Sequence, residues 1–432
     1  MMMPHQLFSK PLCLSFLMGI LSGLPLMVTI TLLQAWASES GISLGKIGLL
    51  ALVGLPYSLK FIWAPLFDYI SLPFLGRRRG WLLVTQIGLI LTISALGFSN
   101  PGNRPGGLVL LITLATAITF FSASQDSIID AFRREDLQDH ELGLGSSYYV
   151  YGYRLGILIT GSGGLFIADF FSWQLTFLSV ACCLLPGLFL TLSCSEPEGI
   201  HPTTPYRQGS ILAPFAEFFQ RPKVLWILLF ILCYKLGDTL AQTMTMPFYL
   251  DVGFSKSEIA TIVKLFGFWG TIVGAGLGGI FIMRLGISRG LWIFGLLQMI
   301  STAGFSLLAL KGADLSWLAL VVAAENCSAG MGTAAFIAYM ARLTNKQFSA
   351  SQYALLSSIM GIPRVILASS SGYIASSLGW FWFFLFCSLI ALPGLLLLPK
   401  CAPWAQEGDG DTKSLFPGNL KNPSLRPNHS SP

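Results

Sequence analysis

The sequence is short of charge. Only 11% of its 432 residues are Asp, Glu, Lys or Arg, whereas 53% are hydrophobic. Soluble globular domains carry about 25% charged residues, so this composition excludes a water-soluble fold and predicts a chain embedded in lipid. The net charge of +6 is sorted between loops and does not indicate a nucleic-acid partner.

The residues that build metal sites and disulfides are also scarce. Histidine occurs only at positions 5, 140, 201 and 429, from which no metal cluster can be assembled. The eight cysteines include no C-x-x-C pair, and we interpret them as small apolar residues. Gly274, Gly276 and Gly279 match a dinucleotide fingerprint, but they fall inside an apolar run without a preceding strand. We therefore expect neither an enzyme nor a bound cofactor.

Long apolar runs, in contrast, fill nearly the whole chain. A helix needs about 20 apolar residues to cross the hydrocarbon of a bilayer, and the alternation of a lipid-facing barrel strand is absent. We expect an all-α polytopic membrane protein with twelve transmembrane helices, at about 11–37, 45–70, 81–99, 107–131, 143–168, 174–194, 222–249, 257–283, 290–310, 315–340, 349–375 and 381–399.

The basic residues are sorted between the two sides of the predicted membrane. If the N-terminus is cytoplasmic, 17 of the 26 Lys and Arg residues fall on the cytoplasmic side and four on the opposite side. Cytoplasmic loops carry an excess of Lys and Arg in membrane proteins. The sequence therefore predicts that both termini are cytoplasmic. The remaining cations fall within spans.

A polar stretch divides the spans into six and six. Residues 195–210 read SEPEGIHPTTPYRQGS, and their proline and charge predict a cytoplasmic linker. The expected domains are a six-helix half at 1–194, a linker at 195–221, a second half at 222–400, and a cytoplasmic tail at 401–432. The composition of the tail predicts disorder.

The two halves resemble each other in sequence. YGYRLG, with Arg154, is matched by MGIPRV, with Arg364, 210 residues later, and Trp173 and Trp380 stand 207 residues apart. Two duplicated six-helix halves joined by a cytoplasmic linker are typical of the major facilitator fold, whose substrate cavity lies between the halves near the midplane. We expect that fold, with pseudo-symmetric halves.

Lys60 lies in the middle of the second predicted span. A lysine at helix centre costs about 2.5–3.5 kcal/mol, so such residues usually face a partner or a wet cavity. Lys60 precedes Asp68 by eight residues, about 12 Å along a helix, which is deep for a side chain that snorkels to the interface. We expect Lys60 to bind a substrate carboxylate or to act as counter-ion for a proton-carrying acid.

Asp68, Arg77 and Arg78 follow at the cytoplasmic end of the same span. A carboxylate there can pair with a neighbouring cation and close the two halves on one side, which predicts a gate. The alternative for the arginines is that they only anchor the loop to the cytoplasm.

The fourth span contains SASQDSIIDAFRRE, with Gln125, Asp126 and Asp130. The two aspartates are four residues apart and share a helix face. Two carboxylates this close in a poorly hydrated site do not both ionise easily, so Asp126 is our candidate proton carrier. The alternative, stronger for Asp130, is a structural ion pair with Arg133 or Arg134.

The second half also carries ionisable residues within its spans. Lys235 and Asp238 are three residues apart, which predicts an internal ion pair lining the cavity. Glu325 is placed either in the cavity or near the outer mouth. Asp130, Asp238 and Glu325 are further candidates for proton coupling, and Lys235 is a candidate for binding the substrate. The duplicated Arg154 and Arg364 are candidates for binding an anionic substrate.

Aromatic and amide side chains suggest sugar contacts. Gln34 and Trp36 stand toward the outer end of the first span, and Tyr151 precedes Arg154 in SSYYVYGYR. These residues and Gln125 are candidate substrate residues. We interpret Tyr148 and Tyr149 as part of an interfacial aromatic belt.

Residues 10 to about 400 closely resemble the AmpG muropeptide permease family. The resemblance is carried by KFIWAPLFD (Lys60 to Asp68), the RRRGW turn, SASQDSIIDAFRRE and GYRLG. The chain departs from the general major facilitator loop motif at Ala64, where glycine is usual, and by extra residues between Asp68 and Gly76.

The resemblance implies an inner-membrane importer of Gram-negative bacteria. Its substrates would be N-acetylglucosaminyl-1,6-anhydro-N-acetylmuramyl peptides (anhydromuropeptides), its import would be driven by protons, and it would act indirectly in β-lactamase induction. Peptide carboxylates suit the buried cations, and sugar hydroxyls suit the amide and aromatic residues. A transporter of another anion, such as an acetyl-CoA-like molecule or a drug, and a non-transporting receptor remain the alternatives. The fold-level expectation is a monomer.

Overall fold

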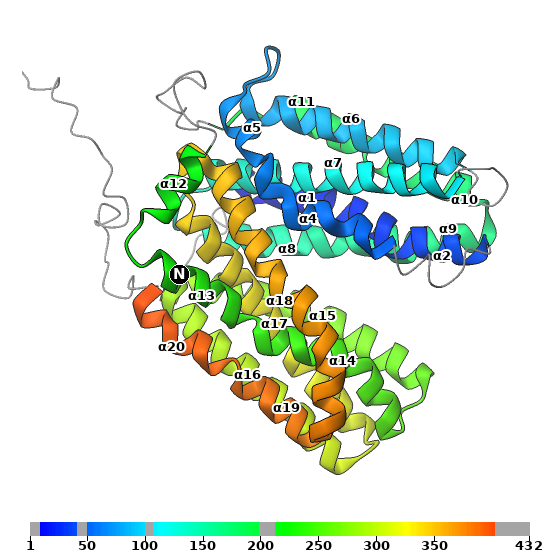
Figure 1. Ribbon diagram of the computed structural model, residues 1–432, viewed down its shortest axis with the longest axis vertical. Helices are drawn as coiled ribbons and strands as arrows, with labels where there is room; N and C mark the ends of the chain where they lie inside the picture. Colours follow the sequence, from blue (N-terminus) through cyan, green and yellow to red (C-terminus); the bar gives the residue numbers. More distant parts are fainter. Residues whose placement is uncertain (1–8, 41–49, 100–106, 198–211, 402–432) are drawn as a thin grey trace, which may run out of the picture.

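The computed structural model describes residues 9–40, 50–99, 107–197 and 212–401, and these are almost entirely helical (Figure 1). The first half contains α1 (Lys10–Met27), the π-helix η2 (Val28–Leu32), α2 (Leu33–Glu39), the 3₁₀ helix η3 (Leu50–Gly54), α4 (Leu55–Leu59), the 3₁₀ turn η4 (Lys60–Ile62), α5 (Ala64–Tyr69), α6 (Arg77–Phe98), α7 (Gly107–Asp136), α8 (Leu142–Leu158), the π-helix η5 (Ile159–Gly163), α9 (Gly164–Phe170), α10 (Trp173–Cys183) and α11 (Leu185–Ser193). After α12 (Ala213–Phe219), the second half contains α13 (Val224–Tyr234), α14 (Leu236–Val252), α15 (Lys256–Leu285), α16 (Ile287–Lys311), α17 (Leu315–Leu343), the 3₁₀ turn η6 (Lys346–Phe348), α18 (Ser349–Leu378), α19 (Trp380–Leu389) and α20 (Leu392–Cys401).

Apart from α12, which lies in the linker predicted at 195–221, these helices lie where the sequence predicts membrane spans. Within the described residues, nine helical stretches are long and apolar enough to cross a membrane. Three further helical stretches, 50–69, 142–170 and 349–378, occupy the other predicted positions.

Proline and glycine explain two interruptions in these stretches. Pro65 lacks a backbone N–H and lies in the first turn of α5, which leaves the turn η4, with Lys60, between α4 and α5. The helical stretch at 142–170 changes from α-helix to π-helix at the glycine-rich run 159–163. Such π-helical insertions are frequent at functional sites.

The contacts of Trp173 and Trp380 confirm that the chain contains a duplicated unit. Trp173, at the start of α10, donates its indole N–H to Glu39 at the end of α2 (2.7 Å), and Trp380, at the start of α19, donates to Asp251 in α14 (2.5 Å). The helical stretches that begin at Trp173 and Trp380 are each interrupted just before an LPG sequence. The two LPG sequences also stand 207 residues apart. Equivalent helices are therefore joined in the same way in both halves.

Small residues let α1 and α8 pack in direct backbone contact. Gly19 and Gly23 of α1 lie against the backbone of α8, and Gly152 and Gly156 of α8 lie against the backbone of α1. In lipid, close packing through small residues takes over the role that the hydrophobic effect plays in water. This contact decides which side chains α1 and α8 present to the interior of the first half.

Gly152→Ala is expected to destabilise the protein. A Cβ atom at this position would overlap the carbonyl oxygen of Phe16, and a helix backbone cannot move aside as a side chain can. Overpacking of this kind costs about 1–3 kcal/mol, which thermal unfolding in detergent would register as a lower transition temperature. The control is Gly163→Ala, whose Cβ meets nothing within 4 Å. Equal stability of the two variants would contradict the packing argument.

The two halves meet at one end of the molecule. In Figure 1 they converge near α5 and α12 and diverge toward α9 and α10 in the first half and α14 in the second. The hydrogen bonds described between the halves join α5, the start of α6, the last turns of α7 and the start of α8 to the later part of α15, the connection between α17 and α18 and the first turns of α18. We name the end where these segments meet the joined end.

Candidate functional site

The contact between α8 and α15 links the two halves through small residues. The Ser147 hydroxyl donates a hydrogen bond to the carbonyl oxygen of Ala275 (2.6 Å) and lies against Gly279. One turn along α8, the hydroxyl of Tyr151 lies against Gly276. The structure therefore places Tyr151, a predicted substrate residue, at the interface between the halves.

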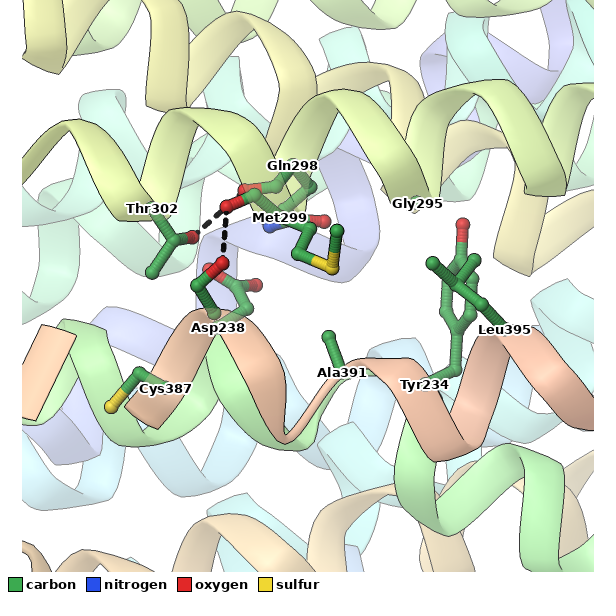
Figure 2. A pocket seen from close by; sticks show the side chains of 10 residues that line it. Tyr234, Asp238, Gly295, Gln298, Met299, Thr302, Cys387, Ala391 and Leu395 are labelled. Atoms are coloured by element: carbon green, nitrogen blue, oxygen red, sulfur yellow. Dashed lines mark hydrogen bonds between the residues drawn. The ribbon is translucent and has the colours of Figure 1, made fainter. Parts of the chain in front are cut away.

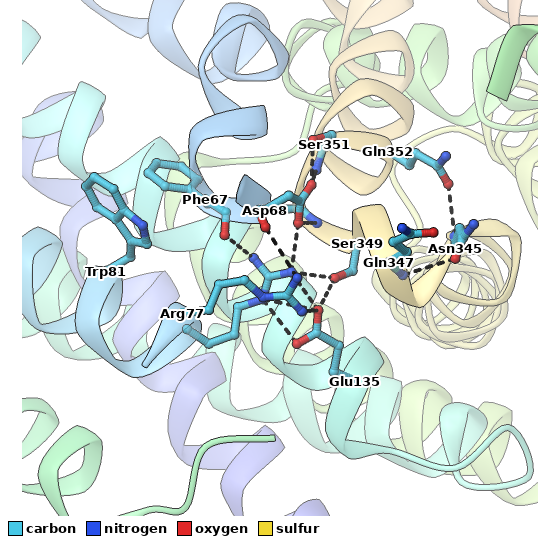
Figure 3. A network of polar contacts seen from close by, with 12 residues as sticks. Phe67, Asp68, Arg77, Trp81, Glu135, Asn345, Gln347, Ser349, Ser351 and Gln352 are labelled. Atoms are coloured by element: carbon cyan, nitrogen blue, oxygen red, sulfur yellow. Dashed lines mark hydrogen bonds and ion pairs between the residues drawn. The ribbon is translucent and has the colours of Figure 1, made fainter. Parts of the chain in front are cut away.

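A buried network of charges lies at the joined end (Figure 3). Arg78 is fully buried, and its Nη2 contacts the carboxylates of Asp68 (2.7 Å) and Glu135 (2.5 Å). Arg77 contacts the same Glu135 carboxylate at 3.0 Å. The three residues predicted to form a gate, Asp68, Arg77 and Arg78, thus lie together, and Glu135 of α7 joins them.

This network also holds the first turn of α18, from the other half. The Asp68 carboxylate accepts hydrogen bonds from the backbone N–H groups of Ala350 (3.1 Å) and Ser351 (2.8 Å) and from the Ser351 hydroxyl (2.5 Å). Ser349 accepts a hydrogen bond from Arg78 at 2.7 Å. A carboxylate at a helix N-terminus is favourable, so these contacts of Asp68 stabilise the joined end.

The side chains around the network are partly shielded from water. Arg134 donates to the carbonyl oxygen of Thr344 across the halves (3.3 Å). Burial, together with the charge of Arg134, lowers the pKa of Lys346 in the connection between α17 and α18. An ammonium group responds in this way when it loses hydration and faces another cation.

A second group of charges lies deeper in the first half and reaches the second half. We name it the acid cluster, and it comprises Lys60, Asp126, Asp130, Arg133, Tyr149 and Tyr353. Asp126 accepts a hydrogen bond from the Ser22 hydroxyl (2.5 Å), which is also bonded to the Tyr149 hydroxyl (2.9 Å). Asp130 pairs with Arg133 at 3.1 Å. The two acids therefore differ: Asp130 is charge-paired, whereas the described hydrogen-bond partner of Asp126 is a neutral hydroxyl.

Lys60 belongs to the interior of the protein and does not face lipid. Its side chain is on η4, the residue is 6% exposed, and it lies within electrostatic range of Asp126 and Asp130. Within the part of the chain that the structure describes, no carboxylate lies within 4.0 Å of its ammonium group. A buried cation without a close anion is unfavourable in a membrane, so Lys60 is available to an acid or a ligand that approaches it.

The second half contains its own polar cluster. Lys235 pairs with Asp238 at 3.4 Å, which confirms the predicted ion pair, and it also donates to the Gln298 side-chain oxygen (3.1 Å). Glu325 is 4% exposed and accepts a hydrogen bond from the Ser301 hydroxyl at 2.5 Å. Glu325 therefore lies inside the second half rather than near a mouth.

Figure 2 shows a small cavity beside this ion pair. Its volume is about 10 Å³, and its lining includes Asp238, Gln298 and Thr302. The Gln298 amide nitrogen is buried and has no hydrogen-bond partner among the described atoms. A space of this size holds about one water molecule. It is too small for a sugar or a peptide, so a larger ligand has to bind elsewhere.

Two predicted substrate residues are exposed. Arg154 of α8 has an exposed side chain and lies within electrostatic range of Asp238 in the other half. Gln34 of α2 is also exposed. Arg364 lies within α18, but its side chain is outside the part that the structure describes.

Two other predicted substrate residues take part in packing. Trp36 is 7% exposed, and its ring centroid lies 5.2 Å from that of Phe177 inside the first half. Gln125 is fully buried, and its amide nitrogen donates to the carbonyl oxygen of Leu21 (2.8 Å). In this state neither side chain is available to a ligand.

Three residues of these networks were not predicted from the sequence. Tyr149, interpreted as part of an interfacial belt, is 9% exposed and bonded to Ser22, so that interpretation is wrong. The backbone contact of α1 with α8 turns this side chain inward. Glu135 stood in the DAFRRE sequence beside the predicted acids, which was a usable signal, whereas nothing in its local sequence marked Tyr353. In the described residues, no group of three or more His, Cys, Asp or Glu is placed to hold a metal ion.

Comparison with known proteins gives evidence for the family and the fold of this chain. The chain matches the model of the Major Facilitator Superfamily over residues 15–324 and 238–424. The anhydromuropeptide permease of Escherichia coli K12 is 42% identical over 399 residues, which cover 92% of this chain and 81% of that protein. A protein of Haemophilus influenzae described as uncharacterized is 40% identical over 94% of this chain and 97% of its own length. The putative transporter AmpG 4 of Rickettsia felis is 34% identical, covering 89% and 94%.

Two solved structures resemble this one at low sequence identity. The proton:xylose symporter XylE superposes with a TM-score of 0.68 at 12% identity, over 90% of this chain and 94% of that chain. The major facilitator transporter FucP, in its outward conformation, superposes with a TM-score of 0.68 at 14% identity, over 91% and 98%. At these identities the likeness establishes the fold and nothing finer.

Proposed function

Because this chain belongs to the AmpG muropeptide permease family of the major facilitator superfamily, we propose that it imports anhydromuropeptides across a bacterial inner membrane. The chain is a membrane transporter and not an enzyme. The observation that carries the proposed substrate is the 42% identity, over 92% of the chain, to an anhydromuropeptide permease. The imported fragments of cell-wall turnover would serve recycling and, indirectly, β-lactamase induction.

The cations within the predicted spans suit the peptide part of such a substrate. Its carboxylates would pair with cations, and charge-assisted hydrogen bonds of this kind are the strong ones. The residues we assign to the peptide carboxylates are Lys60, Arg154, Lys235 and Arg364. The exposed Gln34 and the interfacial Tyr151 are assigned to sugar hydroxyls and amides.

Proton coupling is assigned to Asp126. Its described hydrogen-bond partner is a hydroxyl, and Lys60 is the nearby cation whose attraction a proton on Asp126 would remove. Asp130 is already paired with Arg133, and Asp238 with Lys235, so a proton there would first have to break an ion pair. Glu325, bonded to hydroxyls like Asp126, is the second candidate.

The joined end is assigned to the cytoplasmic side, with both termini cytoplasmic. The arginines of the joined end and the excess of basic residues on the predicted cytoplasmic side support this orientation. The state described here would then be closed to the cytoplasm by the Asp68, Arg77, Arg78 and Glu135 network. Import would require this network to separate while the far ends of the halves approach each other.

Uptake into proteoliposomes tests the proposed function. Labelled anhydromuropeptide is expected to accumulate when the outside is made acidic, and a protonophore is expected to abolish the accumulation. Unlabelled anhydromuropeptide should compete, whereas acetyl-CoA should not. Transport of acetyl-CoA in place of the muropeptide would support the alternative substrate class, and accumulation unaffected by the protonophore would remove proton coupling.

A further inference from the structure

One nitrogen atom of Arg133 joins the acid cluster to the opposite half. Its Nη2 donates both to the carboxylate of Asp130 (3.1 Å) and to the hydroxyl of Tyr353 on α18 (3.2 Å). The residue is 2% exposed, and its Nε and Nη1 have no hydrogen-bond partner among the described atoms. The guanidinium also lies over the ring of Tyr149, 4.4 Å from its centroid. A single shared nitrogen therefore makes the described polar contacts that hold this buried cation.

Tyr353 belongs to the same helical segment that the joined end grips. It follows Ser349 by four residues, about one helical turn. The preceding turn is held by Asp68 through the backbone N–H groups of Ala350 and Ser351. A shift of Tyr353 relative to α7 therefore has to move the helix start that Asp68 binds, because both lie within two consecutive turns of one helix.

The charge of the acids decides how strongly Arg133 is held. Titratable groups face Asp130 from four elements: Asp126 and Arg133 on α7, Lys60 on η4, Tyr149 on α8 and Tyr353 on α18. When an acid of this cluster takes up a proton, the buried cations Lys60 and Arg133 lose part of their compensation. A proton on Asp126 leaves Asp130 as the acid of the cluster that both Lys60 and Arg133 face. Because Asp130 then has to compensate two buried cations, it holds Arg133 beside Tyr353 less strongly.

We propose that Arg133 and Tyr353 are positioning residues that transmit the charge state of the acid cluster to the joined end. With the acids ionised, Arg133 bridges Asp130 to α18 and the halves stay together. With a proton bound, the bridge weakens and α18 is released from the first half. This inference rests on the proposed proton coupling. It also gives that coupling a direction, because protonation from the side opposite the joined end favours opening of the joined end.

Tyr353→Phe tests the bridge, because it removes only the hydroxyl and keeps the ring. Hydrogen exchange of the Ala350 and Ser351 amides is measured on the full-length protein at pH 6 and pH 8, after correction for intrinsic exchange. In the wild type, opening is expected to be about tenfold more frequent at pH 6, as for a coupling in the usual 5–150-fold range. In Tyr353→Phe the difference between the two pH values is expected to fall below about twofold.

Two further variants make the result specific. Tyr373→Phe makes the same chemical change on α18 at a residue that is 81% exposed, and it should keep the wild-type pH dependence. Arg133→Lys keeps the positive charge, but its ammonium group ends one bond short of the position of Nη2 and does not reach both Asp130 and Tyr353, so this variant should behave like Tyr353→Phe. Wild-type pH dependence in Tyr353→Phe overturns the bridge while leaving proton coupling intact. A wild type without pH dependence and without proton-driven uptake overturns both proposals.

Discussion

Asp126→Asn is expected to lower the proton-driven accumulation of substrate by about 100-fold or more. A loss of this size is typical when a proton-transfer group is removed. Asparagine keeps the size of the side chain and can still contact the Ser22 hydroxyl, which is 2.5 Å from the Asp126 carboxylate. It cannot exchange a proton, however, so the two states of the carrier can no longer differ in proton affinity. A carrier shifts between states only by the differential affinity of its ligands.

The measurement separates coupling from binding. Exchange of labelled for unlabelled substrate across the proteoliposome membrane, without a gradient, should persist in Asp126→Asn. The control is Asp169→Asn, which makes the same change on α9 at an exposed position outside the acid cluster and should accumulate substrate normally. Full proton-driven accumulation by Asp126→Asn would transfer the role to Glu325.

Arg78→Gln is expected to destabilise the protein by about 3–5 kcal/mol, since breaking a buried ion pair leaves uncompensated charge. Arg78 is fully buried between the carboxylates of Asp68 and Glu135 and also donates to the carbonyl oxygen of Phe67 at 2.7 Å. Its removal leaves two acids facing each other, because Arg77 pairs with the Glu135 carboxylate but reaches Asp68 only at its backbone carbonyl oxygen (3.3 Å). We also expect uptake to fall more than tenfold, because the joined end loses the cation at its centre.

Thermal unfolding and uptake, measured on the same preparations, check this prediction. Arg79→Gln is the matched control, because the Arg79 side chain is partly exposed and donates to the backbone carbonyl oxygens of residues 191 and 192. Adding Asp68→Asn to Arg78→Gln should restore much of the stability, since Arg77 and Glu135 then remain as a balanced buried ion pair. Uptake should not return with it. A stable and fully active Arg78→Gln would show that the network neither stabilises the fold nor acts as a gate.

Several features of the site followed from local sequence. The Lys235–Asp238 ion pair was predictable because residues three apart on a helix are neighbours. The interior position of Lys60 was predictable because an ammonium group in lipid is costly. The pairing of Asp130 with Arg133 was one of the two alternatives left open, for the same reason of helix spacing.

Other features depended on contacts between distant segments. Trp36 has a ring suited to a sugar, but the structure packs it against Phe177, 141 residues away in the chain. Tyr149 has a polar tip suited to the membrane interface, but the glycine contact of α1 with α8 turns it toward Ser22. Both residues have amphipathic rings, which suit a buried position as well as the membrane interface. The helix packed beside each ring therefore decides which of these two positions the ring takes.

The amino-acid sequence settled the properties that depend on each segment alone. Whether a run of residues enters lipid, where it breaks and which of its charges are costly there are set by its own composition and by the hydrocarbon around it. The tertiary structure decided which charges meet. Asp68 reaches the start of α18 and Arg133 reaches Tyr353 across more than 200 residues. Coulomb attraction acts on distance in space, and that distance exists only after the two halves have packed together.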